Sequence, residues 1–153
     1  MFFLTPLTHT LFLPPNTLTS SIHNTIHTQL YQEKEGSCTS DHGYILAITT
    51  INNIGAIIVE STGHIRIKIK YTAIVLKPEK GEILDANVNE INKLGIFASC
   101  GPMNIFISNY QIPTVMNIEK NTQIRLKIIG TKIDTKKVYA IGTINEDSLG
   151  IIY

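Results

Sequence analysis

The sequence predicts an α+β fold that is mostly β, with an N-terminal domain of one antiparallel sheet and one helix, followed by a C-terminal five-stranded barrel. The 153 residues include 27 Ile and 17 Thr, whose β-branched side chains suit strands. Long stretches alternate between apolar and polar residues, and one stretch has a helical period instead. A short polar linker with Pro78 and Gly81 predicts two domains, 1–77 and 78–153.

The N-terminal half begins with a strand over residues 2–13, because Phe3, Leu7, Leu11 and Leu13 all fall on odd positions. Pro14-Pro15-Asn16 ends this strand and offers a helix N-cap. A helix is then expected over about 17–33, and Gly36 ends it. The apolar stripe that predicts this helix recurs every four residues, at Leu18, Ile22, Ile26 and Leu30.

The remainder of the first half predicts an antiparallel meander. Strands are expected over 37–51 and 56–60, separated by a turn at Asn52-Asn53-Ile54-Gly55. A second turn at 61–64 leads into a strand over 65–76, which opens with strict alternation of Ile and cations.

The second half contains five short apolar segments divided by turn residues. Strands are expected over 82–91, 95–99, 104–107, 124–133 and 138–144. The one long connection, 109–123, follows the third strand. This arrangement is typical of an OB-type barrel.

Composition and motif content narrow the class of function. The formal net charge of +1 argues against a strong non-specific DNA binder. Cys38 and Cys100 form no Cys-x-x-Cys pair, so a reduced intracellular compartment is expected, and no apolar run is long enough to cross a membrane. His23 and His27 have a metal-compatible spacing but no third ligand. No catalytic residues, metal or cofactor are therefore expected.

One pattern in the second half points to RNA. Gly95-Ile96-Phe97-Ala98, followed by Ile105-Phe106-Ile107-Ser108, resembles the S1 class of OB folds. Phe97 and Phe106 would lie on adjacent strands and stack unpaired bases; the alternative is that both belong to the core. Four cations could contact phosphates beside them or could be ordinary solvated surface: Lys93, Lys132, Lys136 and Lys137.

The whole chain resembles the seventh-subunit family of eukaryotic RNA polymerase II. The resemblance begins with Met1-Phe2-Phe3-Leu4 and Glu35-Gly36-Ser37-Cys38-Thr39. It continues through Lys70-Tyr71-Thr72-Ala73-Ile74-Val75 and Asn92-Lys93-x-Gly95-x-Phe97-Ala98. It closes with Ala140-Ile141-Gly142-Thr143-Ile144 and Leu149-Gly150.

The resemblance implies a tip domain plus an S1/OB domain in a non-catalytic nuclear subunit that takes part in transcription initiation. Such a subunit forms a heterodimer, the stalk, with the fourth subunit. It docks on the largest and sixth subunits at the base of the clamp, and its barrel contacts emerging single-stranded RNA. The positions that match the core-docking turns of the family are Asn52, Asn53, Ile54, Gly55, Gly63 and His64.

This sequence departs from the family pattern at those turns and in one loop. The cations usual at both turns are missing, since the chain has Gly55-Ala56-Ile57 and Ser61-Thr62-Gly63-His64 there. Docking by backbone and apolar contacts is therefore expected. The 109–123 connection is also shorter than in many relatives, which leaves the barrel intact but removes surface that could touch RNA or a partner.

Two alternatives remain open at this stage. The chain could be a free-standing S1-domain protein that binds single-stranded RNA, or the equivalent stalk subunit of another RNA polymerase. A free RNA binder has no need of an apolar N-terminal half with so few charges, whereas a subunit with protein interfaces does.

Overall fold

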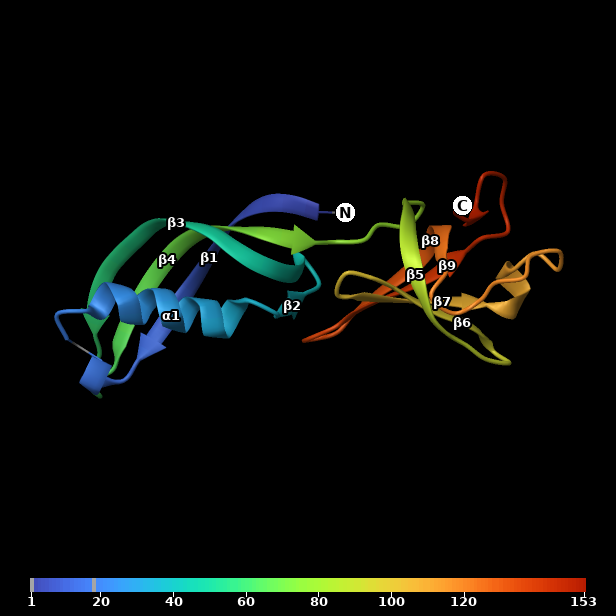
Figure 1. Cartoon of the computed structure of the whole chain (residues 1–153). Coiled ribbons are helices and arrows are strands. Elements are labelled where there is room, and N and C mark those ends of the chain that lie inside the picture. Colours follow the sequence, from blue (N-terminus) through green and yellow to red (C-terminus); the bar gives the residue numbers. More distant parts are fainter. Residues whose placement is uncertain (1, 18) are drawn as a thin grey trace. The chain divides into compact units, whose positions relative to one another are not determined.

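The computed structural model describes residues 2–17 and 19–153, which form two compact units (Figure 1). One unit comprises residues 2–37 and 44–76, and the other comprises residues 38–43 and 77–153. Within the second unit, the N–H of Cys38 donates to the Thr135 carbonyl at 3.0 Å. None of the helices in the described residues has the length and apolarity needed to span a bilayer.

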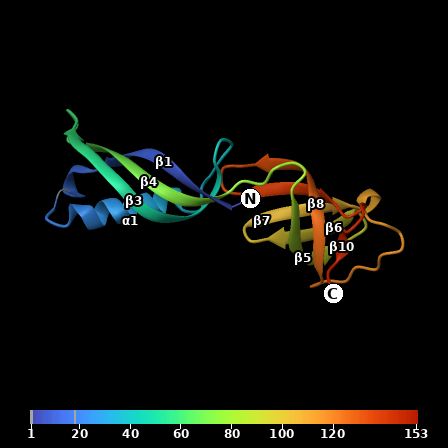
Figure 2. The same ribbon diagram turned by 90° about the horizontal axis from the view of Figure 1, so that it is seen from above.

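The first unit is a sheet covered on one face by a helix, as predicted. Its three long strands lie in the order β1-β4-β3, with bounds Phe2–Leu13 for β1, Ile65–Leu76 for β4 and Gly43–Val59 for β3. The chain also forms a two-residue strand, β2, Cys38–Thr39. Strands β1 and β3 both run antiparallel to β4. Helix α1, Ile22–Lys34, lies along the sheet (Figures 1 and 2).

Alternation along β4 decides which face of the sheet is covered. Ile65, Ile67, Ile69 and Tyr71 are buried and share a core with Ile26 and Leu30 of α1. The intervening cations of β4 are exposed on the opposite face. The helix is also tied to β1 by a polar contact of 2.8 Å between His9 Nε2 and Glu33 Oε2.

The helix begins later than the sequence predicts. Pro15–Thr17 forms a short 3-10 helix, η1, and the first α-helical residue is Ile22. Ser21, not Asn16, precedes the helix, and its carbonyl accepts from the N–H groups of Asn24 and Thr25. Leu18, the first member of the predicted stripe, lies outside the described residues, as does Met1. The predicted start was wrong because Asn16 lies inside the 3-10 turn, in which the N–H and the hydroxyl of Thr17 both donate to the Pro14 carbonyl.

The predicted turn at Asn52-Asn53-Ile54-Gly55 is also wrong. These residues lie inside β3, which pairs with β4 along its length and shifts register between Ile51 and Asn53 and again between Ile54 and Ile57. In β3 these turn-favouring residues form β-bulges instead, because the neighbouring strand β4 is unbroken and offers backbone hydrogen bonds along its whole length. The same region was predicted as two strands, 37–51 and 56–60, and residues 37–42 contain only the two-residue β2.

The second unit is a closed five-stranded barrel, which confirms the OB-type prediction. Strands β8, β5, β6 and β7 are neighbours in antiparallel order, and β9 closes the barrel by pairing in parallel with β7 and antiparallel with β8. A two-residue strand, β10, adds to β8. The bounds are Ile83–Ile91 for β5, Gly95–Cys100 for β6, Met103–Ser108 for β7, Gln123–Ile133 for β8, Val138–Thr143 for β9 and Gly150–Ile151 for β10.

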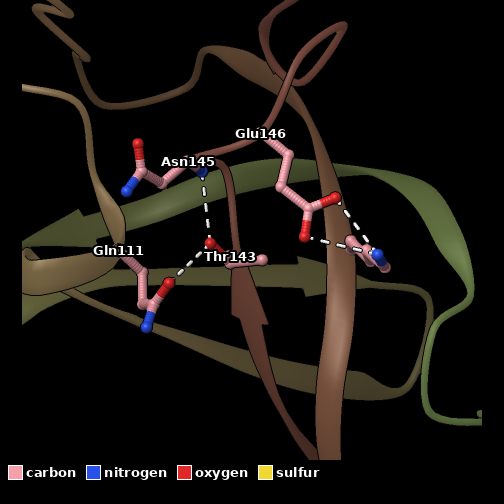
Figure 3. Close-up of polar contacts among 5 residues, drawn as sticks. Gln111, Thr143, Asn145 and Glu146 are labelled. Carbon is pink, nitrogen blue, oxygen red and sulfur yellow. Dashed lines mark hydrogen bonds and ion pairs between the residues drawn. The ribbon is translucent and has the colours of Figure 1, made fainter.

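A buried hydroxyl fixes the end of β9 against the long connection. The Thr143 Oγ1 donates to Gln111 Oε1 at 2.7 Å and accepts from the N–H of Asn145 at 3.2 Å (Figure 3). Gln111 belongs to η2, Asn109–Gln111, a short 3-10 helix that follows β7. Nearby, Lys127 Nζ and Glu146 Oε2 form an ion pair of 3.1 Å. These contacts join three segments that are far apart in sequence.

Gly95 is a position where the backbone of the neighbouring barrel strand leaves no room for a Cβ. A Cβ built there would overlap the carbonyl oxygen of Ile107 on the neighbouring strand. We expect Gly95→Ala to lower the free energy of unfolding by about 1–3 kcal/mol, since overpacking forces the backbone to move. Gly130→Ala is the matched control, because nothing lies within 4 Å of a Cβ there. Equal melting temperatures for the two variants would contradict this expectation.

Candidate nucleic-acid interface

The hairpin of β6 and β7 brings the two predicted stacking residues together. Phe97 pairs directly with Phe106 across the antiparallel ladder. Their ring centroids are 5.0 Å apart with an interplanar angle of 45°. This is a favourable arrangement for two aromatic rings and gives one continuous apolar surface.

Neither ring is fully buried. Phe97 is 39% exposed and Phe106 is half-buried, whereas the residues that alternate with them point into the barrel. Those inward residues, all at most 2% exposed, are Ile96, Ala98, Ile105 and Ile107. The two Phe side chains therefore lie on the outer face of the barrel. That they stack RNA bases stays a prediction.

Strand β9 extends this face into a groove. It runs beside β7 in parallel register, with Ile141 opposite Phe106 and Tyr139 opposite Asn104. Ile141 is 49% exposed and Tyr139 is 37% exposed. The groove has a volume of about 600 Å³. Its lining comprises Asn89, Phe97, Ala98, Asn104, Ile105, Phe106, Gly130, Thr131, Lys132, Lys137, Tyr139, Ala140 and Ile141.

Two of the four predicted cations lie at this groove. Lys132 on β8 is directly opposite Tyr139, and Lys137 immediately precedes β9. Lys93 and Lys136 do not line it, and Lys93 instead offers its carbonyl to the side-chain amide of Asn109. None of the described residues that line the groove is acidic. The groove can thus present an apolar floor and positive charge together, which is what an unpaired nucleotide requires.

The sequence interpretation missed Tyr139, Ile141 and Asn104. Alternation along β9 did carry a signal, because Val138 and Ala140 are small apolar residues that point inward and leave 139 and 141 outside. The alternation did not predict which strand β9 would lie beside. Strand β9 begins 30 residues after the end of β7, and the two strands pair only because the barrel closes.

The positions expected to dock on the polymerase core divide between a strand and a turn. Asn52 lies on β3, where its side-chain amide donates to Thr72 Oγ1 at 2.8 Å. Asn53, Ile54 and Gly55 follow on the same strand, and Gly55 approaches β4 so closely that a Cβ would lie 2.9 Å from the Lys68 carbonyl oxygen. Gly63 and His64 lie in the β3–β4 turn, where the Gly63 N–H donates to the Glu60 carbonyl at 2.9 Å.

The titratable groups with perturbed pKa values lie away from the groove. Burial raises the pKa of the Cys38 thiol, and burial together with the charges of Asp85 and Glu82 raises the pKa of Cys100. A hydrogen bond from Arg125, whose Nε lies 2.8 Å from Asp85 Oδ1, lowers the pKa of that carboxyl. Within residues 2–17 and 19–153, no group of three His, Cys, Asp or Glu side chains could hold a metal ion.

Comparison with known proteins gives the same two-part organisation. Residues 8–85 match the family described as "SHS2 domain found in N terminus of Rpb7p/Rpc25p/MJ0397", and residues 77–141 match "S1 RNA binding domain". The chain is 38% identical to a DNA-directed RNA polymerase II subunit RPB7 of Glycine max, over 99% of this chain and 97% of that protein.

Other relatives show how far the similarity extends. A DNA-directed RNA polymerase II subunit rpb7 of Dictyostelium discoideum is 37% identical, with 99% of both chains covered. A DNA-directed RNA polymerase V subunit 7 of Arabidopsis thaliana is 30% identical, over 73% of this chain and 74% of that protein.

Proposed function

The chain belongs to the family of RNA polymerase II subunit 7, and we propose that it acts in the nucleus as a non-catalytic subunit of that polymerase. In this role it forms the stalk with the fourth subunit, docks on the largest and sixth subunits at the clamp base, contacts the emerging transcript and takes part in initiation. The observation that carries the proposal is the match to polymerase II relatives over 99% of the chain, across both structural units.

Pairing with the fourth subunit is supported by the outer edge of the first unit. Strand β1 is a terminal strand of its sheet, so among residues 2–17 and 19–153 no strand pairs with the other side of its backbone. It also exposes large apolar side chains, with Phe2 51%, Leu4 68% and Phe12 60% exposed. A long apolar edge strand is an aggregation hazard unless another chain covers it.

Docking on the core enzyme is supported by the apolar end of the β3–β4 hairpin. Ile57, Ile58 and Val59 are 46%, 47% and 61% exposed and lead directly into the turn with Gly63 and His64. The nearest charges partly neutralise each other, because Arg66 Nη1 lies 3.7 Å from Glu60 Oε1. We assign the core contact to this hairpin, with Asn52, Asn53, Ile54 and Gly55 on the strand behind it.

Contact with the transcript is supported by the groove, with Phe97, Phe106, Lys132 and Lys137 as its RNA-binding residues. Lys93 and Lys136 stay candidates for phosphate contacts outside it. A free-standing RNA-binding protein would share this groove but not the exposed edge strand. The stalk subunit of another polymerase is the weaker alternative, because the polymerase V relative covers 73% of the chain.

The first prediction concerns the solution state. Expressed alone, the protein is expected to self-associate, because the apolar edge of β1 is uncovered. Co-expressed with the fourth subunit, it should elute as a 1:1 complex in size-exclusion chromatography with light scattering. A monodisperse monomer that shows no affinity for the fourth subunit would count against the proposal and in favour of a free-standing protein.

A second prediction concerns docking on the core enzyme. Raising the ionic strength from about 0.1 M to about 1 M shortens the screening length from about 10 Å to about 3 Å, yet the stalk should stay bound, because its docking surface is apolar. Val59→Asp should release the stalk, whereas Val115→Asp, at a valine of the second unit that is 92% exposed against 61% for Val59, should not. The amount of core enzyme pulled down with the stalk measures the effect of salt and of each variant. Release by moderate salt would contradict the proposal.

A third prediction separates stacking from a structural role of Phe97. Phe97→Ala should weaken binding of single-stranded RNA by roughly 1–3 kcal/mol. Its cost in unfolding free energy should stay below the roughly 3–5 kcal/mol of a buried Phe, because the ring is 39% exposed. Phe12→Ala, in the other unit, is the control for RNA affinity. A thermal melt and an RNA titration of the Phe97→Ala variant distinguish the two roles. If neither the melting temperature nor the RNA affinity changes, Phe97 does not stack a base.

A further inference from the structure

We propose that the groove holds two neighbouring unpaired bases, the first on the Phe97–Phe106 pair and the second on Tyr139. This inference rests on the RNA contact proposed for the same groove. It adds a second stacking position, and it specifies the ligand as a single strand of at least two unpaired nucleotides.

The spacing of Tyr139 from the Phe pair requires a separate base. Tyr139 lies on the strand next to Phe106, two residues before Ile141, which is the residue opposite Phe106. With about 4.8 Å between strands and about 3.3 Å per residue, the two Cα atoms are roughly 8 Å apart. Among the described aromatic rings, Phe97 and Phe106 contact each other, and Tyr139 contacts neither. Its ring is therefore available to a base of its own.

The polar groups of the groove gather around Tyr139 and leave the Phe end apolar. Lys132 is its cross-strand neighbour on β8, and Asn104 is its neighbour on β7. The Asn104 amide makes no hydrogen bond to the described residues, so it can both donate to and accept from a base edge. The other amide that lines the groove, Asn89, accepts from the hydroxyl of Ser99, which is the partner of Asn104 on the neighbouring strand.

This arrangement gives the groove a direction and excludes paired RNA. A nucleotide stacked on Tyr139 places its phosphate within reach of Lys132 and Lys137, while the base on Phe97 and Phe106 needs no charge beside it. In a duplex the faces of both bases are covered by neighbouring pairs. Only single-stranded segments and loops offer two free base faces to such a surface.

A double-mutant cycle on the full chain, in complex with the fourth subunit, tests the second position. With a labelled oligouridylate, Tyr139→Ala should lower affinity roughly 5- to 150-fold, and Tyr139→Phe should leave it nearly unchanged. Combined with Phe97→Ala, the two losses should multiply, because each removes a different base contact. A double variant no weaker than Phe97→Ala alone would show that Tyr139 only supports the Phe pair, and would overturn the proposal.

A fluorescence test detects a base at position 139 directly, without comparing the affinities of variants. The chain has no tryptophan, so Tyr139→Trp introduces one fluorophore into the groove, and subtracting the wild-type signal removes any contribution from the partner. The oligouridylate should quench this fluorescence, and a blunt RNA duplex should not. Tyr110→Trp, at a 93% exposed tyrosine outside the groove, is the matched control. Equal quenching at both positions, or none at 139, would overturn the second stacking site.

The outcomes also separate this inference from the function on which it rests. If Phe97→Ala weakens binding and Tyr139→Ala does not, RNA binds in the groove but only one base is stacked, and the two-base site is wrong. If neither variant changes affinity, the RNA contact itself lies elsewhere and both proposals fail. Thermal melts of all variants establish that each loss arises in a folded protein.

Discussion

The parallel pairing of β7 with β9 is the constraint on which the candidate site depends. Met103 and Ile105 pair with Val138 and Ala140, and all four are buried in the barrel. A slip of one residue would turn Val138 and Ala140 outward and carry Tyr139 inward. Burial of these small apolar side chains therefore fixes the register of the outer face as well. The groove is a consequence of core packing.

A comparable constraint organises the first unit through β4. Its alternating residues place every odd side chain from 65 to 75 in the core and face cations outward. Because β4 is central, β1 and β3 must follow its register, and β3 does so only by means of bulges. The bulges absorb the extra residues around Asn52 and Gly55 without breaking the ladder. The hairpin consequently ends further along the chain, at 60–64, directly after the exposed apolar residues Ile57, Ile58 and Val59.

What could be predicted from sequence follows from how local the deciding interactions are. Period-two patterns predicted β1 and β4, and apolar segments between turn residues predicted the five barrel strands. The Gly95–Phe97 spacing predicted which face carries the aromatic pair. Asn52 and Gly55 were misleading, because a turn propensity was overruled by a partner strand supplied by residues further along the chain. Tyr139 was missed for a related reason: its neighbours Asn104 and Lys132 come from other strands, and only barrel closure brings them together.

The charge of the protein decides how such a groove can bind RNA. With 13 Lys and Arg against 12 Asp and Glu, few phosphates can be neutralised, so counterion release contributes little to affinity. Stacking must then supply most of the binding free energy, at about 1–3 kcal/mol per base. Two stacked bases give an affinity that depends little on salt and not at all on sequence-specific pairing. A contact of that kind can hold a single strand briefly and release it as the strand moves on, which fits the proposed contact with a transcript of changing sequence.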